Sequence, residues 1–258
     1  MIILLNSSKT MVSTPIKGCR QRPALLDDAA KLDAQLKAMD VTDLRKLMHI
    51  SEKLGSETHG VIQKWSTNAG AQTPAIEAFQ GDIYRGLLVD LLSDDDRQYA
   101  NEHIRILSGL YGILRPNDLV MPYRLELMYA LSGDGFRNLY DFWGDRVAAT
   151  LPKRGMIFDL ASEEYSKLIR PFVDEKRVIE PEFLTAARAG DEPTFVAVHA
   201  KVARGAMARW MVTNRIDSLD GLRAFPLMGY QFDADRSTAS EPVFVRTGAF
   251  PVAKYDGT

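Results

Sequence analysis

The chain has 258 residues, of which 46% are hydrophobic and 26% are charged, so its apolar content is sufficient for a substantial core. Its formal net charge of −2 excludes the strongly basic balance of a dedicated nucleic-acid coat protein, so any binding of a polyanion must come from local clusters of basic residues. The single cysteine, Cys19, excludes an intramolecular disulfide and the paired cysteines of zinc and redox sites, and we interpret it as an incidental thiol.

The N-terminal run Ile2–Leu5 is apolar and rich in β-branched residues, which predicts a buried strand. This run is far shorter than the roughly 20 residues that span a bilayer, and no basic segment precedes it as in a signal peptide. We therefore expect a cytoplasmic protein with no membrane partner. The strand leads into the polar loop Asn6-Ser7-Ser8, and Lys9 and Thr10 follow directly.

Helical periodicity follows in the first half of the chain. Apolar residues recur every three or four positions over residues 24–39, and Leu44 to Leu54 indicates a second helix. Thr73-Pro74 predicts a further helix start. Ser93 and three aspartates predict the N-terminus of a helix over Arg97–Leu107, because a helix dipole favours negative charge there.

The second half alternates strand and helix patterns, which favours an α/β or mixed α+β fold. We predict a single compact domain over residues 1–258, with residues 185–193 as a surface loop. The predicted strands are Met156–Leu160, Thr194–His199, Met228–Phe232 and Val243–Arg246, and the predicted helices are Leu139–Thr150 and Lys201–Ile216.

Several loops combine turn-forming residues with hydrogen-bond donors, which favours a phosphate-bearing ligand. Glycines let backbone amides approach an anion closely, and arginine adds bidentate charge-assisted bonds. The alternative is that Gly109 and Gly112 only end a helix while Arg115 and Asp118 pair locally. The loops concerned contain Lys9-Thr10, Gly81-Asp82-Ile83-Tyr84, Ser108 to Gly112, Arg115 to Asp118 and Pro122-Tyr123-Arg124.

The segment Lys201–Arg215 separates into an apolar arc and a basic arc at about 100° per residue. Lys201, Arg204, Arg209 and Arg215 share the basic arc, which contains no acidic residue. It is interpreted as a basic face over a core-facing stripe, and the alternative is an ordinary solvated helix face.

Standard catalytic signatures are missing from the sequence, including the nucleophile elbow, the phosphate loop, the dinucleotide fingerprint and the HExxH zinc motif. The four histidines show no i, i+4 pair, so we predict no metal site and no cofactor. Glu126, Glu163 and Glu164 are candidate general acids or bases, and the sequence does not show which of them share a cleft.

A series of ordered sequence blocks covers most of the chain. The blocks are Ser8-Lys9-Thr10, Ala78–Leu87, Leu107–Pro116 with Asp118, Pro122–Glu126, Leu139–Asp145, Asp159–Tyr165, Ala200–Gly205 and Gly229–Asp233. Together, and in this order, they resemble the YaaA family of bacterial peroxide stress proteins. The shared order makes the resemblance specific although each block alone is weak.

The resemblance implies a protein that is induced by hydrogen peroxide, binds double-stranded DNA without sequence preference and limits iron-mediated DNA damage. It also implies one mixed α/β unit whose mixed sheet and flanking helices border a positively lined cleft. A helix-hairpin-helix-like element would occupy Arg97–Pro116, with its hairpin at Gly109–Gly112. Phosphate contacts would come from Lys9, Thr10, Ser108, Gly109, Gly112, Arg115, Arg124, Lys201, Arg204 and Arg209.

Three departures from the family pattern favour a second hypothesis. Asn6-Ser7-Ser8-Lys9 replaces a usual Ser-Pro-Ala-Lys, Gln80 replaces a typical lysine, and Trp210 occupies a position that is ordinarily less bulky. In this alternative the chain is an enzyme that acts on a small anionic, nucleotide-like substrate in the same cleft. Its catalytic residues would be Lys9, Tyr84, Arg124 and Glu126. Under either hypothesis, Lys9, Tyr84, Arg124 and Lys201 are expected to approach one cleft, because each follows a turn or strand end.

Overall fold

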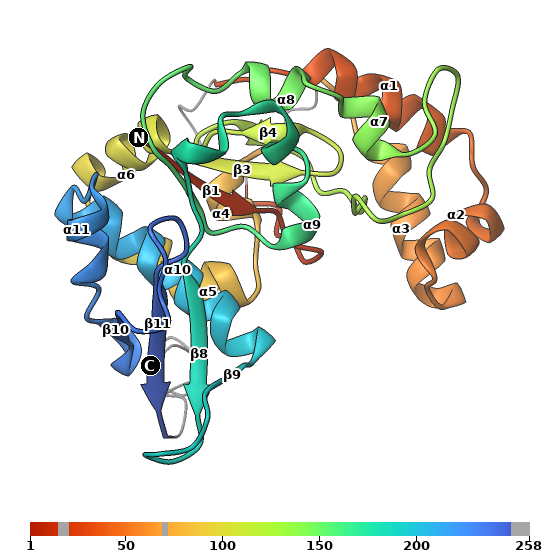
Figure 1. Ribbon diagram of the computed structural model, residues 1–258. Coiled ribbons are helices and arrows are strands. Elements are labelled where there is room, and N and C mark those ends of the chain that lie inside the picture. Colours follow the sequence, from red (N-terminus) through yellow and green to blue (C-terminus); the bar gives the residue numbers. More distant parts are fainter. Residues whose placement is uncertain (15–20, 69–71, 249–258) are drawn as a thin grey trace.

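The computed structural model describes residues 1–14, 21–68 and 72–248, so Cys19 lies outside the described residues. These residues form a mixed α/β structure, which confirms the predicted fold class (Figure 1). The main sheet has the strand order β4-β3-β1-β6-β7. Its strands are β1 (Ile2–Asn6), β3 (Ile104–Ser108), β4 (Gly112–Leu114), β6 (Ile157–Asp159) and β7 (Val178–Ile179).

Strand β1 is the centre of the main sheet because its side chains are apolar on both faces. Ile3, Leu4 and Leu5 are fully buried, as expected for a parallel strand that is covered on both sides. It pairs in parallel with β3, where Ile3 lies opposite Ile104, and in parallel with β6. Strand β4 pairs antiparallel with β3, so the sheet is mixed as predicted.

A second sheet with the order β10-β11-β8-β9 lies apart from the main sheet, and Figure 1 shows the long helix α10 between the two. Strands β2 and β5 form a separate antiparallel pair. The strands of these sheets are β2 (Thr73–Pro74), β5 (Leu119–Val120), β8 (Glu182–Ala186), β9 (Thr194–Phe195), β10 (Gln231–Asp233) and β11 (Val243–Thr247).

Helices cover the main sheet, and α1, α2 and α3 lie together at one end of the molecule (Figure 1). The α-helices are α1 (Leu26–Lys37), α2 (Val41–Met48), α3 (Glu52–Lys64), α4 (Ala75–Ala78), α5 (Asp82–Leu87), α6 (Asp94–His103), α7 (Leu139–Trp143), α8 (Arg146–Ala149), α9 (Glu163–Ser166), α10 (Ala197–Asn214) and α11 (Leu219–Arg223). Short 3-10 turns are η1 (Val89–Leu91), η2 (Arg170–Phe172), η3 (Glu175–Arg177) and η4 (Leu227–Gly229).

The helix predicted over Arg97–Leu107 is wrong in its second half. Helix α6 begins after Ser93, whose hydroxyl accepts the Asp96 N–H as predicted for an N-cap, but it ends at His103. The following residues form β3, in which Ile104 and Ile106 are fully buried between two neighbouring strands. Pairing with β1 and β4 overrides the local helical pattern, because a strand here buries both faces of an apolar run.

The helix-hairpin-helix-like element assigned to Arg97–Pro116 is therefore wrong for this segment. The chain there is the end of α6, then β3, a turn and the antiparallel strand β4. Gly112 adopts a φ of 68°, a left-handed conformation that glycine adopts without strain, and it begins β4 opposite Ser108. The glycines thus make a β-hairpin turn rather than a turn between two helices.

Other predicted elements also differ in their limits. Of the strand predicted over Met228–Phe232, the first two residues belong to the 3-10 turn η4 and only Gln231 and Phe232 lie in β10. The helix predicted from Leu44 to Leu54 is divided at His49, which has a φ of 53°, and α3 starts afresh with Ser51 as its N-cap. The helix predicted over Leu139–Thr150 is interrupted at Gly144. The strand predicted over Thr194–His199 ends at Phe195, and α10 begins at Ala197.

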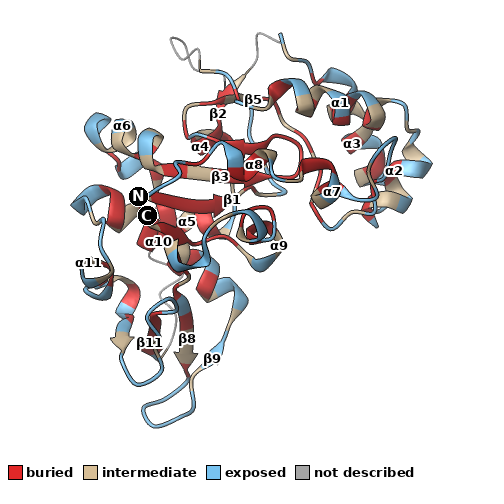
Figure 2. Cartoon of the chain, turned by 45° about the horizontal axis from the view of Figure 1, so that its top comes forward, coloured by how far each residue is buried: buried red, intermediate tan, exposed pale blue. Residues whose placement is uncertain are grey.

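Helices α5 and α10 cross at two glycines. A Cβ on Gly205 would lie 1.8 Å from the Ile83 carbonyl oxygen, and one on Gly86 would lie 1.9 Å from the Val202 carbonyl oxygen. The two backbones are thus in direct contact, which only residues without side chains allow. Figure 2 shows that both helices are largely buried together with β1. Within the described part of the chain, no helix combines the length and apolar character needed to cross a membrane.

We expect Gly205→Ala to destabilise the protein by about 1–3 kcal/mol or more, because its methyl group would have to push two backbones apart. Gly60→Ala is the matched control: Gly60 lies in α3 and nothing is within 4 Å of its added Cβ. This control should be neutral or stabilising by up to about 1 kcal/mol. Urea unfolding midpoints measure both effects, and equal stability of the two variants would contradict the close crossing.

Candidate functional site

A pocket of about 310 Å³ opens at the carboxyl edge of the main sheet, where β1 and β6 end side by side. Ligands gather at this edge in α/β proteins because the loops after parallel strands converge there. The pocket is lined by Asn6, Ser7, Ser8, Lys9, Gln80, Gly81, Asp82, Ile83, Tyr84, Glu126, Ser162, Glu164, Tyr165 and Lys201, and we call it the Lys9 pocket.

Hydrogen bonds between distant segments fix the walls of the Lys9 pocket. The Asn6 side-chain oxygen accepts the Ser162 N–H at 3.0 Å, which joins the loop after β1 to the loop after β6. The Tyr84 hydroxyl donates to the Asn6 carbonyl oxygen at 3.1 Å, which joins α5 to the same loop. Lys201 comes from the first half of α10, which the glycine crossing holds against α5.

Lys9 and Glu126 face each other in the pocket, with 4.0 Å between Lys9 Nζ and Glu126 Oε2. The Lys9 side chain is 56% exposed whereas that of Glu126 is 14% exposed, so the carboxylate lies deeper. Burial and the nearby charge of Glu164 raise the pKa of Glu126, and Lys9 and Arg124 partly oppose this. The result is a carboxyl group whose pKa is shifted towards the range useful for proton transfer.

Two tyrosine hydroxyls complete the polar surface of the pocket. Burial raises the pKa values of Tyr84 and Tyr165 well above the ordinary value of 10.0, so both stay protonated at neutral pH. The Tyr165 hydroxyl bonds to Glu126 and accepts a hydrogen bond from Ser7 at 3.3 Å. These hydroxyls are therefore hydrogen-bond donors rather than bases.

The structure brings together most of the residues expected at one cleft. Lys9, Tyr84 and Lys201 line the Lys9 pocket, and Glu126 lies with them. Arg124 is close enough to Glu126 to lower its pKa, but it is not among the lining residues. Thr10 is exposed just beyond Lys9, and its N–H donates to the Ser8 hydroxyl at 3.2 Å.

The glycine amides predicted to hold a phosphate do not reach the surface. Ser108 is fully buried and hydrogen-bonds to Tyr123, and Gly109 and Gly112 are buried with it. The Gly109 carbonyl oxygen accepts the Trp143 indole N–H at 3.0 Å. These residues are therefore not placed to make the predicted phosphate contacts. The turn is packed against the core because β3 and β4 are strands of the main sheet.

The predicted basic residues do not form one continuous face. Arg115 follows β4, which runs antiparallel to β3, so it lies at the opposite edge of the sheet from Lys9. Arg209 donates to the Gly86 carbonyl oxygen and is half-buried. Arg215 pairs with Asp96 at 2.7 Å, so an acidic residue of another element neutralises this end of the predicted basic face.

Arg204 is directed inwards rather than towards solvent. It is half-buried, and its Nε has no hydrogen-bond partner among the residues that the structure describes. Burial lowers the pKa of Arg204, and Asp159 is the strongest opposing charge. The phosphate-contact role predicted for Arg204 therefore does not fit its half-buried position.

Sequence reasoning missed Ser162 and Tyr165 as pocket residues, and it left Glu164 as one of three candidate carboxylates. The available signal was their position directly after the strand predicted at Met156–Leu160, at the same edge as Lys9. Within residues 1–14, 21–68 and 72–248, no three His, Cys, Asp or Glu side chains are grouped so that they could hold a metal ion.

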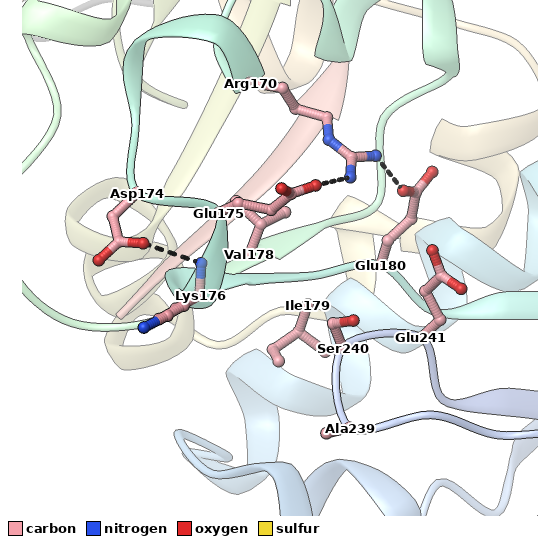
Figure 3. A pocket seen from close by; sticks show the side chains of 10 residues that line it. All are labelled: Arg170, Asp174, Glu175, Lys176, Val178, Ile179, Glu180, Ala239, Ser240 and Glu241. Carbon is pink, nitrogen blue, oxygen red and sulfur yellow. Dashed lines mark hydrogen bonds and ion pairs between the residues drawn. The ribbon is translucent and has the colours of Figure 1, made fainter.

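A larger pocket, of about 510 Å³, lies beside β7 (Figure 3). Its central cation, Arg170, points at Glu175 and Glu180 and forms ion pairs with both. The Asp174 carboxylate accepts the Lys176 N–H and so caps a local turn. Arg170 is therefore already paired with two carboxylates and is less available to an anionic ligand than the two lysines of the Lys9 pocket.

Comparison with known proteins identifies relatives over almost the whole chain. A family model described as "Peroxide stress protein YaaA" matches residues 1–236. A UPF0246 protein of Salinispora tropica is 44% identical over 246 residues, which cover 95% of this chain and 94% of that protein. A UPF0246 protein of Clostridium perfringens is 40% identical over 255 residues, which cover 95% of this chain and 100% of the relative.

The stability of the protein should depend on the ionisation of Asp159, the buried residue at the end of β6. Burial raises its pKa to about 6 from the ordinary 3.8, although hydrogen bonds from Ser166 and Ala161 lower it. Because the pKa is higher in the folded protein than in the unfolded chain, ionising Asp159 costs more free energy in the folded state. The free energy of unfolding is therefore highest at low pH and falls as the pH rises from about 4 through 6.

We therefore expect the wild type to lose about 3 kcal/mol relative to Asp159→Asn between about pH 4 and pH 7. Urea unfolding of both proteins across this range measures the difference between their free energies of unfolding. The contributions of the other titrating groups are the same in both proteins and cancel in this difference. Parallel stability curves would show that Asp159 titrates normally.

Proposed function

This chain belongs to the YaaA family of peroxide stress proteins, and from that premise we propose that it acts in the cytoplasmic defence against hydrogen peroxide as an enzyme. Its substrate would be a small anionic molecule bound in the Lys9 pocket. The observation that carries the proposal is the pairing of an exposed lysine with a mostly buried glutamate of raised pKa, 4.0 Å apart, at the carboxyl edge of a parallel sheet.

The residues of the pocket divide the chemistry between them. Lys9 and Lys201 bind the anionic group of the substrate, because both are exposed at the pocket and carry its positive charge. Glu126 accepts or donates a proton, since burial and Glu164 hold its pKa above the usual range. Tyr84 holds the loop after β1 in place through its hydrogen bond to the Asn6 carbonyl oxygen, and Arg124 adds a positive charge near Glu126.

DNA binding is the second candidate function, and one observation favours it. Lys9 and Lys201 are exposed at the pocket, and Thr10 is exposed next to Lys9 in the chain, so a phosphate backbone has access to them. Binding through these residues would be independent of sequence, because phosphate contacts position a protein without reading bases. In this version the protein limits iron-mediated damage by covering duplex DNA. The separation of Arg115, Arg204 and Arg209 from the mouth makes this the weaker candidate.

Glu126→Gln separates the two candidates. It removes proton transfer while keeping the size of the side chain, and it makes the pocket more positive. The enzyme proposal expects peroxide survival to fall to the level of a deletion strain, whereas a DNA-binding protein should bind DNA equally well or better. Glu163→Gln is the matched control, because Glu163 is 85% exposed and paired with Lys167. Normal survival with Glu126→Gln would overturn the enzyme proposal.

Lys9→Arg and Lys9→Ala test DNA binding directly. If Lys9 is only a counter-charge for phosphate, arginine should retain DNA affinity within a few-fold, because it keeps the positive charge. Affinity should also fall steeply between 50 and 200 mM salt, by roughly a thousandfold for six or more phosphate contacts. Fluorescence anisotropy with two unrelated duplexes measures both effects. A flat salt dependence, with both variants equal to the wild type, would exclude this candidate.

A further inference from the structure

The charged side chains of the Lys9 pocket are of both signs. Two cations, Lys9 and Lys201, share the lining with the three carboxylates of Asp82, Glu126 and Glu164, so the formal charge of the lining is −1. A pocket built only for phosphate would exclude carboxylates, because like charges next to an anion are unfavourable. The lining therefore indicates a ligand with both an anionic end and an end that donates hydrogen bonds.

The cations are available to a ligand. Lys201 has no hydrogen-bond or ion-pair partner among the residues that the structure describes, and Lys9 reaches Glu126 only at 4.0 Å. A separation of 4.0 Å between charged atoms is longer than a direct charge-assisted hydrogen bond. An anionic group of a ligand would thus gain two cations without breaking a short ion pair.

The carboxylates of the pocket have fewer hydrogen-bond donors than they can accept. Asp82 has its own partner, Arg85, at 3.4 Å. Glu126 and Glu164 instead line the same pocket, and the charge of Glu164 raises the pKa of Glu126. Glu164 accepts one backbone N–H, from Met128 at 3.2 Å. A ligand with several N–H donors would relieve this repulsion, because each carboxylate accepts more hydrogen bonds than it now has.

A planar group with adjacent N–H donors is the best match for such acceptors, since two parallel N–H bonds fit the two oxygens of one carboxylate. The guanidine group has this shape, and the N1–C2–N2 edge of guanine is its cyclic equivalent. The pocket volume of about 310 Å³ suits a molecule of mononucleotide or amino-acid size and is too small for a macromolecular ligand to enter.

We propose that the Lys9 pocket binds a small molecule that carries an anionic group for Lys9 and Lys201 and a guanidine-type edge for Glu126 and Glu164. Two kinds of molecule have this chemistry, a guanine mononucleotide and a free guanidino amino acid. The inference rests on the proposed function, because it names the substrate class of the same site.

Isothermal titration of the full chain tests this with GMP and L-arginine as probes. Each has a matched ligand that keeps the anion: inosine monophosphate lacks the exocyclic amino group, and L-citrulline replaces guanidinium with a neutral urea. One probe should bind roughly tenfold or more tightly than its matched ligand. The matched ligand leaves the carboxylates of Glu126 and Glu164 without these N–H donors, and buried acceptors without donors lower the affinity. Tighter binding of GMP would identify the nucleotide, and tighter binding of L-arginine the amino acid.

The difference in affinity between a probe and its matched ligand should disappear in Glu164→Gln, because an amide cannot accept two parallel N–H bonds. It should persist in Glu163→Gln, the neighbouring exposed control. Lys201→Gln should weaken the probe and its matched ligand equally, since it removes only the anion contact. Circular dichroism and urea unfolding of each variant establish that it is folded, so loss of binding reports the contact itself.

Two results would overturn the inference and leave the proposed function standing. The first is binding of ribose 5-phosphate as tight as that of GMP, with no discrimination between L-arginine and L-citrulline. The second is no binding of any probe while Glu126→Gln still abolishes peroxide survival. If no probe binds and Glu126→Gln has normal survival, both the inference and the enzyme proposal fail.

Discussion

The direct backbone contact between α5 and α10 is the constraint on which the candidate site depends. Gly86 and Gly205 allow the two helices to approach until carbonyl oxygens lie where side chains would otherwise be. Tyr84 is on α5 and Lys201 is on α10, one turn before Gly205. If a side chain separated the helices, these two residues would move away from each other and from Lys9, so the spacing of the pocket follows from the absence of two methyl groups.

The buried strand β1 is the second element that positions the site. Its four apolar residues place it at the centre of the main sheet, so its carboxyl end is fixed beside that of β6. The polar residues that follow therefore leave a rigid core and face one another across a narrow edge. The bond from Ser162 to Asn6 and that from Tyr84 to Asn6 both use the first residue after the apolar run. A single asparagine thus connects three segments that are distant in the sequence.

The family membership and the pocket are compatible, although the predicted basic cleft is not continuous. The family indicates a role in the peroxide response. The positive charges that the sequence suggested for DNA are divided among the pocket, the opposite edge of the sheet and the interior, where Arg204 neighbours Asp159. The charges at the pocket combine with carboxylates and protonated tyrosines, and such mixed polar groups are typical of a site that binds and converts a small molecule.

The sequence by itself determined the fold class, the family, the central strand at Ile2–Leu5, the helix over Lys201–Ile216 that forms most of α10, and the position of Lys9 at a strand end. These features are local or rest on many ordered motifs, so periodicity and composition contain them. Only the tertiary structure decided that Ile104–Ser108 is a strand, that Gly109 and Gly112 are buried, and that Arg204 points inwards. It also decided that Glu126 and Glu164 share a pocket with Lys201. The physical reason is that strand pairing, burial and charge proximity depend on contacts between residues far apart in the chain, and such contacts leave no local pattern.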